Sequence, residues 1–292
     1  MYYECHMHIF MNGRDYREAV AQYKNGVDEA DIREKLAAYA RTGVQYVRDG
    51  GDHYGASALA ARLAPEYGIR YRAPVFAVHK NGHYGKIVGR GFDTLKEYRQ
   101  LVKEASAAGA DFIKIMVSGI LDFEREGALT EDSLDREEIR EMIHIAHEEG
   151  FSVMAHTNGP DAVHAVIDAG VDSIEHGNFM DEECLQALSG SRTIWVPTFV
   201  TIANLIGGGR FDDASVGRLK ERQGAIIRRG FALGVTIAPG SDAGAYRVPH
   251  AQGIVDEYEE LYGLCRDLMT RETFDAKMAD AGREVEGRFR RT

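Results

Sequence analysis

Near its start the chain reads Tyr3-Glu4-Cys5-His6-Met7-His8-Ile9-Phe10, a mostly apolar stretch that is typical of a β-strand. Successive side chains of a strand point to opposite faces, so His6 and His8 lie on the same face. Two neighbouring imidazoles on one face can bind a single metal ion. A histidine pair with this spacing also arises by chance in surface strands, so its meaning depends on the rest of the chain.

Strand-like and helix-like segments alternate along the whole sequence. Short apolar or β-branched runs are followed by amphipathic stretches, and no Pro/Ser-rich linker interrupts the pattern. This alternation is typical of a (β/α)8 TIM barrel. The predicted strands are 2–8, 45–48, 71–77, 111–117, 152–156, 173–176, 194–197 and 236–239, and the clearest predicted helices are 31–39, 94–108, 136–148, 216–233 and 255–264. We therefore predict an α/β fold, a TIM barrel formed by one domain over residues 1–292.

A glycine lies between several predicted helices and the strand that follows. A glycine just past a helix adopts the left-handed conformation that closes the last turn. The recurrence therefore marks helix-to-strand junctions independently of the apolar pattern. The glycines are Gly43, Gly68, Gly109, Gly150, Gly170 and Gly234.

The composition excludes some classes of partner. The formal net charge is -11 and the pI is about 5.5, whereas nucleic acids and anionic membranes bind clustered lysines and arginines. We therefore expect a small-molecule substrate and no nucleic-acid or membrane partner. We also expect a homo-oligomer. Cys5, Cys184 and Cys265 are too far apart to indicate a disulfide framework or a thiolate metal site. With no signal-peptide pattern and no apolar run of about 20 residues, we predict a cytoplasmic protein.

A lysine interrupts the predicted fourth strand. Lys114 lies between Ile113 and Ile115 in the apolar run 111–117. Burying a bare ammonium group is costly, so this position indicates a functional or modified lysine. The alternative is a lysine near the strand end whose amine reaches solvent.

Three further residues that can bind metal follow predicted strands. His156 and His176 each end an apolar strand before a glycine-containing turn, and Asp242 follows the last predicted strand. Each alone has an ordinary explanation, as a hydrogen-bonded histidine or a turn-forming carboxylate. The carboxyl ends of barrel strands meet at one mouth, however, so all three are expected to converge with His6 and His8.

This ordered set of residues resembles the metal-dependent amidohydrolase superfamily. Three motifs resemble its imidazolonepropionase-like branch, which includes dipeptidases of the prolidase and arginine carboxypeptidase type. The motifs are Ile113-Lys114-Ile115-Met116, Ser173-Ile174-Glu175-His176-Gly177 and Gly240-Ser241-Asp242-Ala243-Gly244. The resemblance extends over nearly the whole chain.

The resemblance implies a centre with two divalent metal ions, for which zinc is the first expectation. Lys114 would be carboxylated on its amine and bridge the two ions. The first ion would be bound by His6, His8 and Asp242, and the second by His156 and His176. This list of metal ligands is implied by the family comparison and not by spacing alone.

The same comparison implies a mechanism for cleaving an amide bond, most simply in a dipeptide or an N-acyl amino acid. A hydroxide that bridges the two ions would attack the scissile carbonyl. Asp242 would take its proton and pass it to the leaving amine. Asp242 and Lys114 are therefore the expected catalytic residues.

The chain departs from the family pattern in two ways. Family members usually carry a small β-sandwich at the two ends of the barrel, and its strands are missing from this sequence, so we expect a barrel without the sandwich or a chain that lacks its ends. Glu4 replaces the aspartate that usually lies two residues before the first metal-binding histidine.

Specificity in such barrels comes from loops at the mouth. The loop 78–85 resembles a glycine- and histidine-containing loop of the dipeptidase-like members, so His83, His79 and Tyr84 are expected to contact substrate. Tyr246, after the last predicted strand, is a further candidate. A solvated polar loop is the alternative for each of them.

Three other functions stay open at this point. The same ligands can serve a lactonase or phosphotriesterase, whereas a mononuclear deaminase or imidazolone hydrolase does not require Lys114. A noncatalytic ligand-binding barrel is the rival from another class, because a fold by itself does not define a function. Loss of a metal ligand would favour that rival, and none is lost here.

Overall fold

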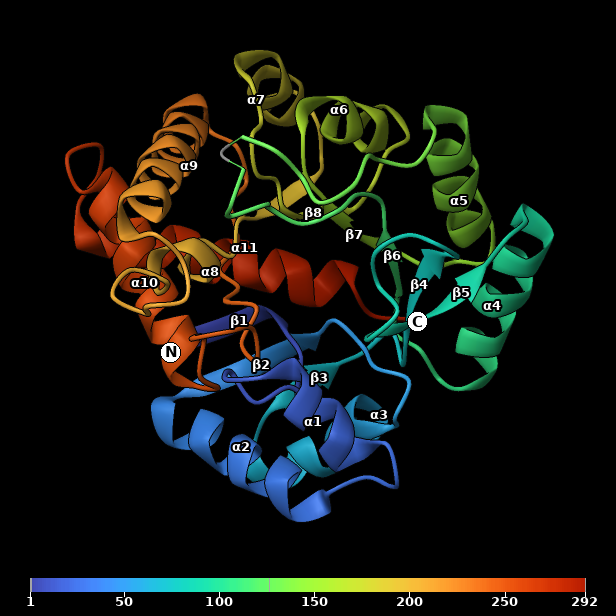
Figure 1. Ribbon diagram of the computed structural model, residues 1–292. Coiled ribbons are helices and arrows are strands. Elements are labelled where there is room, and N and C mark those ends of the chain that lie inside the picture. Colours follow the sequence, from blue (N-terminus) through green and yellow to red (C-terminus); the bar gives the residue numbers. More distant parts are fainter. Residues whose placement is uncertain (1, 126, 292) are drawn as a thin grey trace.

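Parallel strands form the centre of the structure, and most of the helices surround them (Figure 1). The computed structural model describes residues 2–125 and 127–291. Its strands are β1 (Tyr2–Met7), β2 (Val44–Asp49), β3 (Arg70–Arg72), β4 (Ala77–Lys80), β5 (Gly89–Phe92), β6 (Ile113–Met116), β7 (Val153–Thr157), β8 (Ser173–His176) and β9 (Ile194–Val196). Its helices are α1 (Tyr16–Tyr23), α2 (Glu29–Thr42), α3 (Ala56–Leu63), α4 (Leu95–Ala107), α5 (Arg136–Glu148), α6 (Pro160–Asp168), α7 (Glu182–Ser189), α8 (Val200–Ala203), α9 (Asp213–Leu233), α10 (Gln252–Cys265) and α11 (Arg271–Arg288), with the 3-10 helix η1 (Ala64–Tyr67).

The strands pair in parallel in two sheets that share one segment of chain. The first sheet has the order β1-β2-β3, and the second has the order β5-β4-β6-β7-β8-β9. β3 pairs with β2, whereas β4, which follows β3 directly in the sequence, pairs with β6. The segment 70–80 therefore belongs to both sheets and serves as the third strand of the barrel.

The segment 236–243 joins the remaining two edges. The Trp195 N–H of β9 donates to the Thr236 carbonyl at 2.9 Å, and the Cys5 N–H of β1 donates to the Pro239 carbonyl at 3.0 Å. These hydrogen bonds place the segment between the last strand and the first. The predicted α/β barrel fold is confirmed, whereas the single-domain assignment over residues 1–292 stays a prediction.

Two strand predictions need correction. The predicted strand 71–77 is broken into β3 and β4 because Pro74 has no N–H to donate and Val75 has a left-handed φ of 68°. The predicted strand 236–239 forms one isolated bridge, between Ile237 and Trp195. β5, which pairs outside β4, was not predicted.

Local capping explains where several helices begin and end. Thr94 and Glu97 form a capping box at the start of α4, and the Asp135 carboxylate accepts hydrogen bonds from the first turn of α5. α2 and α9 end at Gly43 and Gly234 in the left-handed conformation. All six glycines predicted to end helices have a positive φ, between 71° and 86°.

The end of the barrel opposite the strands' carboxyl ends is closed by α11, which crosses behind the strands in Figure 1. Gly282 of α11 lies against the Tyr3 ring, where a Cβ atom would come within 2.3 Å of Tyr3 Cγ. Phe289, just after α11, packs edge-on against Phe112 with ring centres 5.4 Å apart. This packing leaves the strands' carboxyl ends as the open side. Among the described residues, no helix is both long and apolar enough to cross a membrane.

Candidate metal centre

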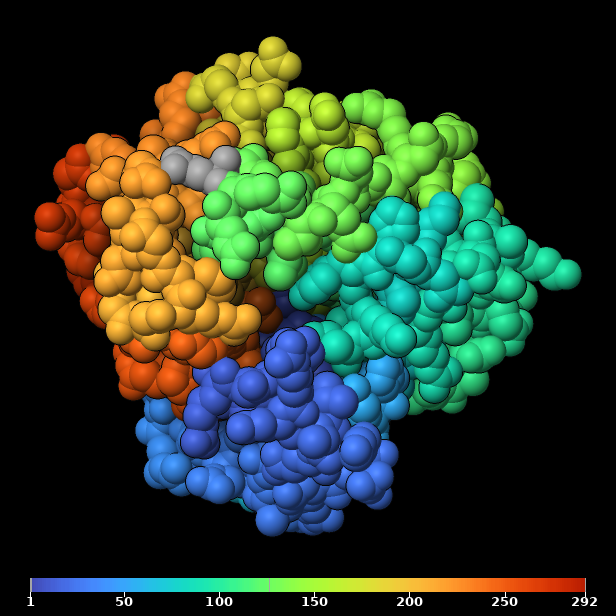
Figure 2. Space-filling view, viewed as in Figure 1, coloured from blue at the N-terminus to red at the C-terminus, as the bar shows by residue number. Residues whose placement is uncertain are grey.

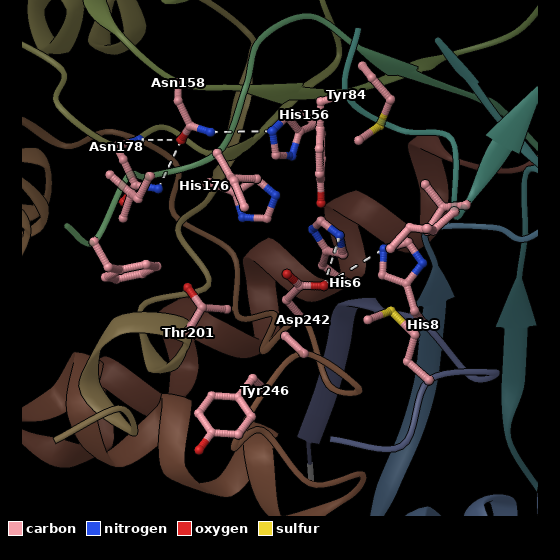
Figure 3. Close-up of a pocket in the computed structure, with 18 of the residues that line it drawn as sticks. His6, His8, Tyr84, His156, Asn158, His176, Asn178, Thr201, Asp242 and Tyr246 are labelled. Atoms are coloured by element: carbon pink, nitrogen blue, oxygen red, sulfur yellow. Dashed lines mark hydrogen bonds and ion pairs between the residues drawn. The ribbon is translucent and has the colours of Figure 1, made fainter. Parts of the chain in front are cut away.

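The six side chains predicted to bind metal line one cavity of about 250 Å³ at the carboxyl ends of the strands (Figure 3). Strand register brings several of them together, because Met116 pairs with His156 and Thr157 pairs with His176. Figure 2 shows the opening at the centre of this face. The six residues are His6, His8, Lys114, His156, His176 and Asp242.

His6, His8 and Asp242 form a compact group of possible ligands. Asp242 Oδ1 lies 3.6 Å from His6 Nε2 and 3.8 Å from His8 Nε2. One potential ligand atom from each residue lies within 4.8 Å of the other two. Ligands at about 2.0–2.2 Å from a common ion have similar separations, so the group fits one divalent cation after small adjustments.

His156 and His176 lie beside this group. Their ring centres are 4.5 Å apart, and the His176 ring centre is 5.1 Å from that of His6. Lys114 Nζ is 3.5 Å from His6 Nε2, so the lysine amine lies within the histidine cluster. The arrangement provides a second pair of imidazoles and a lysine beside the first group of ligands.

In at least two of the four histidines, the ring nitrogen that faces away from the cavity has a hydrogen-bonding partner. His8 Nδ1 lies 3.1 Å from the Gly51 carbonyl, and His176 Nδ1 lies 2.7 Å from Thr198 Oγ1. Metal-binding histidines are usually fixed in this way by a partner on the second ring nitrogen. In both residues Nε2 stays free to bind a metal ion.

The other two histidines also have polar partners. His6 Nδ1 lies 2.8 Å from Glu175 Oε2, at ion-pair distance but off the direction of a good hydrogen bond. His156 Nε2 lies 3.3 Å from the Gly119 carbonyl and 3.4 Å from Asn158 Nδ2. The other ring nitrogens, His156 Nδ1 and the His6 Nε2 atom that faces Lys114 and Asp242, are then the ones available to a metal ion.

Burial sets the protonation of the cavity. It lowers the pKa of His8 and of His156 to about 3, with a further contribution from the Lys114 charge. Burial likewise lowers the pKa values of His6 and His176 well below their usual range. The imidazoles are therefore neutral at pH 7, which is the form that binds metal.

Burial favours the neutral forms of the Lys114 and Asp242 side chains. Burial lowers the pKa of Lys114 to about 8 and raises that of Asp242 to about 7. A bare ammonium group beside four imidazoles is a poor fit to this cavity. The neutral imidazoles and the Asp242 carboxylate are ligand types that divalent metals prefer, so the donor set fits a metal centre.

Backbone strain is concentrated at the site. His176 has a φ of 67°, Asp242 a φ of 56° and Thr198 a φ of 48°. Residues other than glycine seldom adopt such values, and when they do they are often functional. Here two predicted metal ligands and the partner of one of them share this conformation.

Glu4 fixes the segment of chain that carries Asp242. Its carboxylate accepts hydrogen bonds from the Ser241 N–H at 2.8 Å and from the Ser241 hydroxyl. It also accepts from the His6 N–H at 3.3 Å. The glutamate that departs from the family pattern therefore ties the first strand to the residue before Asp242.

The predicted substrate contacts divide into two groups. Tyr84 and Tyr246 line the cavity, and the Tyr84 ring centre is 5.0 Å from that of His156. His79 and His83 are not in the lining: His79 Nδ1 is 2.9 Å from the Lys80 carbonyl, and His83 pairs at 3.5 Å with Glu131. Substrate contact by any of the four stays a prediction.

Sequence reasoning missed several residues around the site. Glu175 and Arg48 are charged residues within buried strands, which is a signal that could have singled them out. Arg210, Phe123 and Phe211 line the cavity from loops, and nothing in their sequence surroundings predicts it.

Comparisons with known proteins agree with this architecture. The Amidohydrolase family model matches residues 2–244. Ochratoxinase of Aspergillus niger is 28% identical over 166 residues, which cover 51% of this chain and 32% of the relative. An uncharacterized protein of Mycobacterium tuberculosis is 29% identical over 151 residues, covering 50% of this chain and 40% of the relative. The matched part thus spans less than half the length of these curated relatives.

Solved structures share the fold. A Xaa-Pro dipeptidase with bound methionine has a TM-score of 0.75 at 21% identity, covering 97% of this chain and 75% of the other. The Aspergillus niger ochratoxinase structure has a TM-score of 0.76 at 21% identity, covering 96% and 70%. With the family model matching most of the chain and the metal-binding residue types gathered in one cavity, this protein belongs to the amidohydrolase family.

Proposed function

We propose that this protein is a metal-dependent hydrolase that cleaves the amide bond of a dipeptide or an N-acyl amino acid. The observation that carries the proposal is the convergence of four neutral imidazoles, Lys114 and Asp242 on one cavity. The similarity of this chain to proteins named ochratoxinase and Xaa-Pro dipeptidase supports an amide substrate.

The metal centre in this proposal holds two divalent ions, with zinc as the expected metal. His6, His8 and Asp242 would hold one ion, His156 and His176 would hold the other, and carboxylated Lys114 would be a ligand shared by both. Carboxylation forms a bond between Nζ and the carbon of CO₂ with release of two protons from the ammonium form, which turns a buried cation into an anion. When bound, the ions would supply Lewis-acid chemistry for the scissile carbonyl and would lower the pKa of the attacking water.

Asp242 has the position for proton transfer. Its Oδ1 atom lies 3.6 Å from His6 Nε2 and 3.8 Å from His8 Nε2, so it is beside the place of the proposed first ion and its attacking water. A carboxylate within reach of that water can accept its proton and release it to the leaving group. Asp242 therefore takes the proton of the attacking water and delivers it to the leaving amine.

The test compares metal content per chain, by elemental analysis, in the parent and in Lys114→Ala, with both grown with added zinc and bicarbonate. Lys220→Ala is the matched control, because Lys220 pairs with Glu260 at 2.8 Å and does not line the cavity. We expect two ions in the parent and in the control, fewer in Lys114→Ala, and hydrolysis of dipeptides or N-acyl amino acids by the parent.

Other outcomes would favour the alternatives. One ion that is unaffected by Lys114→Ala would indicate a mononuclear hydrolase or deaminase. Hydrolysis of lactones or phosphotriesters without any amide hydrolysis would indicate the ester-cleaving type. Protein that binds no metal under these conditions would indicate a noncatalytic barrel.

A further inference from the structure

The cavity that contains the candidate metal centre has a large apolar wall. Its polar ligands cluster at the strand ends, whereas the loops around them contribute mainly aliphatic and aromatic side chains. Such a wall removes apolar substrate groups from water and favours their binding. The apolar and aromatic lining residues are Met11, Tyr84, Ile87, Val88, Met116, Ile120, Leu121, Phe123, Leu205, Phe211, Ala245 and Tyr246.

Arg210 is a permanent cation at the edge of this wall. Among the described lining residues, Lys114 and Arg210 are the two with cationic side chains, apart from the histidines, and Asp242 is the one with an anionic side chain. Lys114 is buried within the histidine cluster, whereas Arg210 is exposed. Arg210 is thus placed to meet an anionic group of a substrate away from the scissile bond.

Two aromatic rings hold the Arg210 guanidinium while leaving it without an ionic partner. Its Cζ atom lies 5.0 Å from the ring centre of Tyr246 and 5.2 Å from that of Phe211. Among the described residues no carboxylate lies within 4.0 Å of it, although many other arginines of the chain form such pairs. A stacked guanidinium keeps its N–H edge free, and that edge matches the two oxygens of a carboxylate.

The neighbouring Arg247 does not have this freedom. Its Nε donates to the Asn204 carbonyl at 2.6 Å, and it is not part of the cavity lining. The two arginines therefore differ in role, since Arg247 fixes a loop whereas Arg210 faces the cavity.

The position of Tyr246 indicates on which side of Asp242 the amine part of the substrate lies. Tyr246 follows Asp242 by four residues, and Figure 3 shows it beyond Asp242, on the side away from His156. Because Asp242 delivers a proton to the leaving amine in the function proposed above, the amine part of the substrate lies on this side. Arg210 stacks on Tyr246 and therefore lies where that part of the substrate extends.

An apolar contact between two loops lies beside Arg210. The rings of Phe123 and Phe211 have centres 4.7 Å apart, and they pack with Leu121 and Leu205 in one hydrophobic cluster. A large apolar side chain next to the carboxylate would contact this cluster. The two features together describe the amine part of the substrate as an apolar amino acid with a free carboxylate.

We propose that Arg210 binds the α-carboxylate of the amino acid released by hydrolysis, and that Phe123 and Phe211 select a large apolar side chain on that amino acid. The proposal rests on the amide hydrolase function proposed above. It narrows the substrate class to N-acyl amino acids and dipeptides with an apolar C-terminal residue.

The test uses the metal-loaded enzyme and pairs of substrates that differ by one group. N-acetyl-L-phenylalanine is compared with N-acetyl-2-phenylethylamine, which lacks only the carboxylate, and with N-acetyl-L-serine, which lacks the apolar ring. L-Alanyl-L-phenylalanine and its decarboxylated analogue form a second pair. The variants are Arg210→Met, Arg210→Lys and Phe211→Ala, with Arg266→Met as the control at an exposed arginine outside the cavity.

We expect Arg210→Met to lower kcat/KM for the carboxylate substrates by about tenfold to a hundredfold, as for loss of a charge-assisted hydrogen bond. Most of this change is expected in KM, and the decarboxylated analogues are expected to change by less than about twofold. Arg210→Lys is expected to be intermediate, because it keeps the charge and loses the planar fork. Phe211→Ala is expected to reduce the preference for phenylalanine over serine, and Arg266→Met to change nothing.

A binding measurement adds a readout that does not depend on turnover. L-Phenylalanine is expected to bind the parent more tightly than 2-phenylethylamine does in calorimetry, and Arg210→Met is expected to abolish that difference. If the enzyme cleaves both members of each pair equally well and Arg210→Met has no effect, this inference is wrong and the amide hydrolase function stands. If the metal-loaded enzyme cleaves no amide at all, the proposed function fails and this inference fails with it.

Discussion

His6 Nδ1 and Glu175 Oε2 lie 2.8 Å apart, and both side chains are buried from solvent. The other Glu175 oxygen, Oε1, accepts from Arg48 at 2.8 Å and from the Ser173 hydroxyl. Arg48 is itself buried and lies 4.2 Å from the Phe289 ring centre. A chain of contacts thus links the candidate metal centre to the packing at the closed end of the barrel.

Glu175→Gln is expected to weaken metal binding at the first site by roughly tenfold to a hundredfold, because the partner of the His6 ring loses its charge. Metal affinity is measured by competition with a chelator of known affinity. Glu182→Gln is the control, since Glu182 pairs with Arg229 on the surface. Unchanged metal affinity in Glu175→Gln would show that Glu175 serves only to neutralise Arg48.

Gly50→Ala is expected to displace the His8 imidazole, because a Cβ atom at Gly50 would lie 2.3 Å from His8 Cε1. The expected result is loss of metal from the first site, measured as metal content per chain. Gly217→Ala is the control: Gly217 lies within α9 and a Cβ there meets nothing within 4 Å. That control is expected to keep its metal and to gain up to about 1 kcal/mol of stability from helix propensity. Equal metal content in the two variants would contradict the prediction.

The left-handed backbone at His176 predicts an order of stability among its variants. With a φ of 67°, this position tolerates asparagine better than a β-branched residue. We expect His176→Val to be less stable than His176→Asn by about 1–2 kcal/mol in denaturant unfolding of the metal-free protein. The same two substitutions at His164, within α6, are expected to differ by only about a few tenths of a kcal/mol. A similar difference at both positions would argue against strain at His176.

Glu257 predicts a pH dependence of stability. Its carboxylate accepts from the Phe199 and Val200 N–H groups at 3.0 and 2.8 Å, yet burial raises its pKa to about 8 from an ordinary value of 4.5. Because the pKa is raised, the folded protein binds this proton more tightly than the unfolded chain does. The contribution of Glu257 to the free energy of unfolding is therefore complete below pH 4.5 and is lost as the pH rises through 8. Glutamine does not ionise, so the stability of the parent relative to Glu257→Gln is expected to fall between about pH 5 and about pH 8.5.

Denaturant unfolding of the metal-free proteins at several pH values measures this trend. Glu260→Gln is the control, because Glu260 lies on the same helix, is partly exposed and pairs with Lys220. The difference in stability between the parent and Glu260→Gln is expected to stay constant over this pH range. A constant difference between the parent and Glu257→Gln across the range would show that Glu257 keeps one protonation state in the folded and unfolded chain.

Local patterns in the sequence determined the type of fold. The alternation of apolar runs and amphipathic stretches reflects burial of strands inside a ring of helices, and helix-ending glycines such as Gly150 and Gly170 have the expected left-handed conformation. The sequence also singled out His6, His8, His156 and His176, because histidines at the ends of apolar strands are conspicuous and barrel strands share one mouth.

Only the tertiary structure decided how these residues are held and what surrounds them. The break at Pro74 and Val75 and the strain at His176 and Asp242 depend on long-range packing, which overrides local preference. The contact of His6 with Glu175 spans 169 residues of sequence, and Arg210 reaches the cavity from a loop without any regular pattern. Strand periodicity is a property of neighbouring residues and can be read along the chain, whereas cavity walls form from loops brought together by folding of the whole barrel.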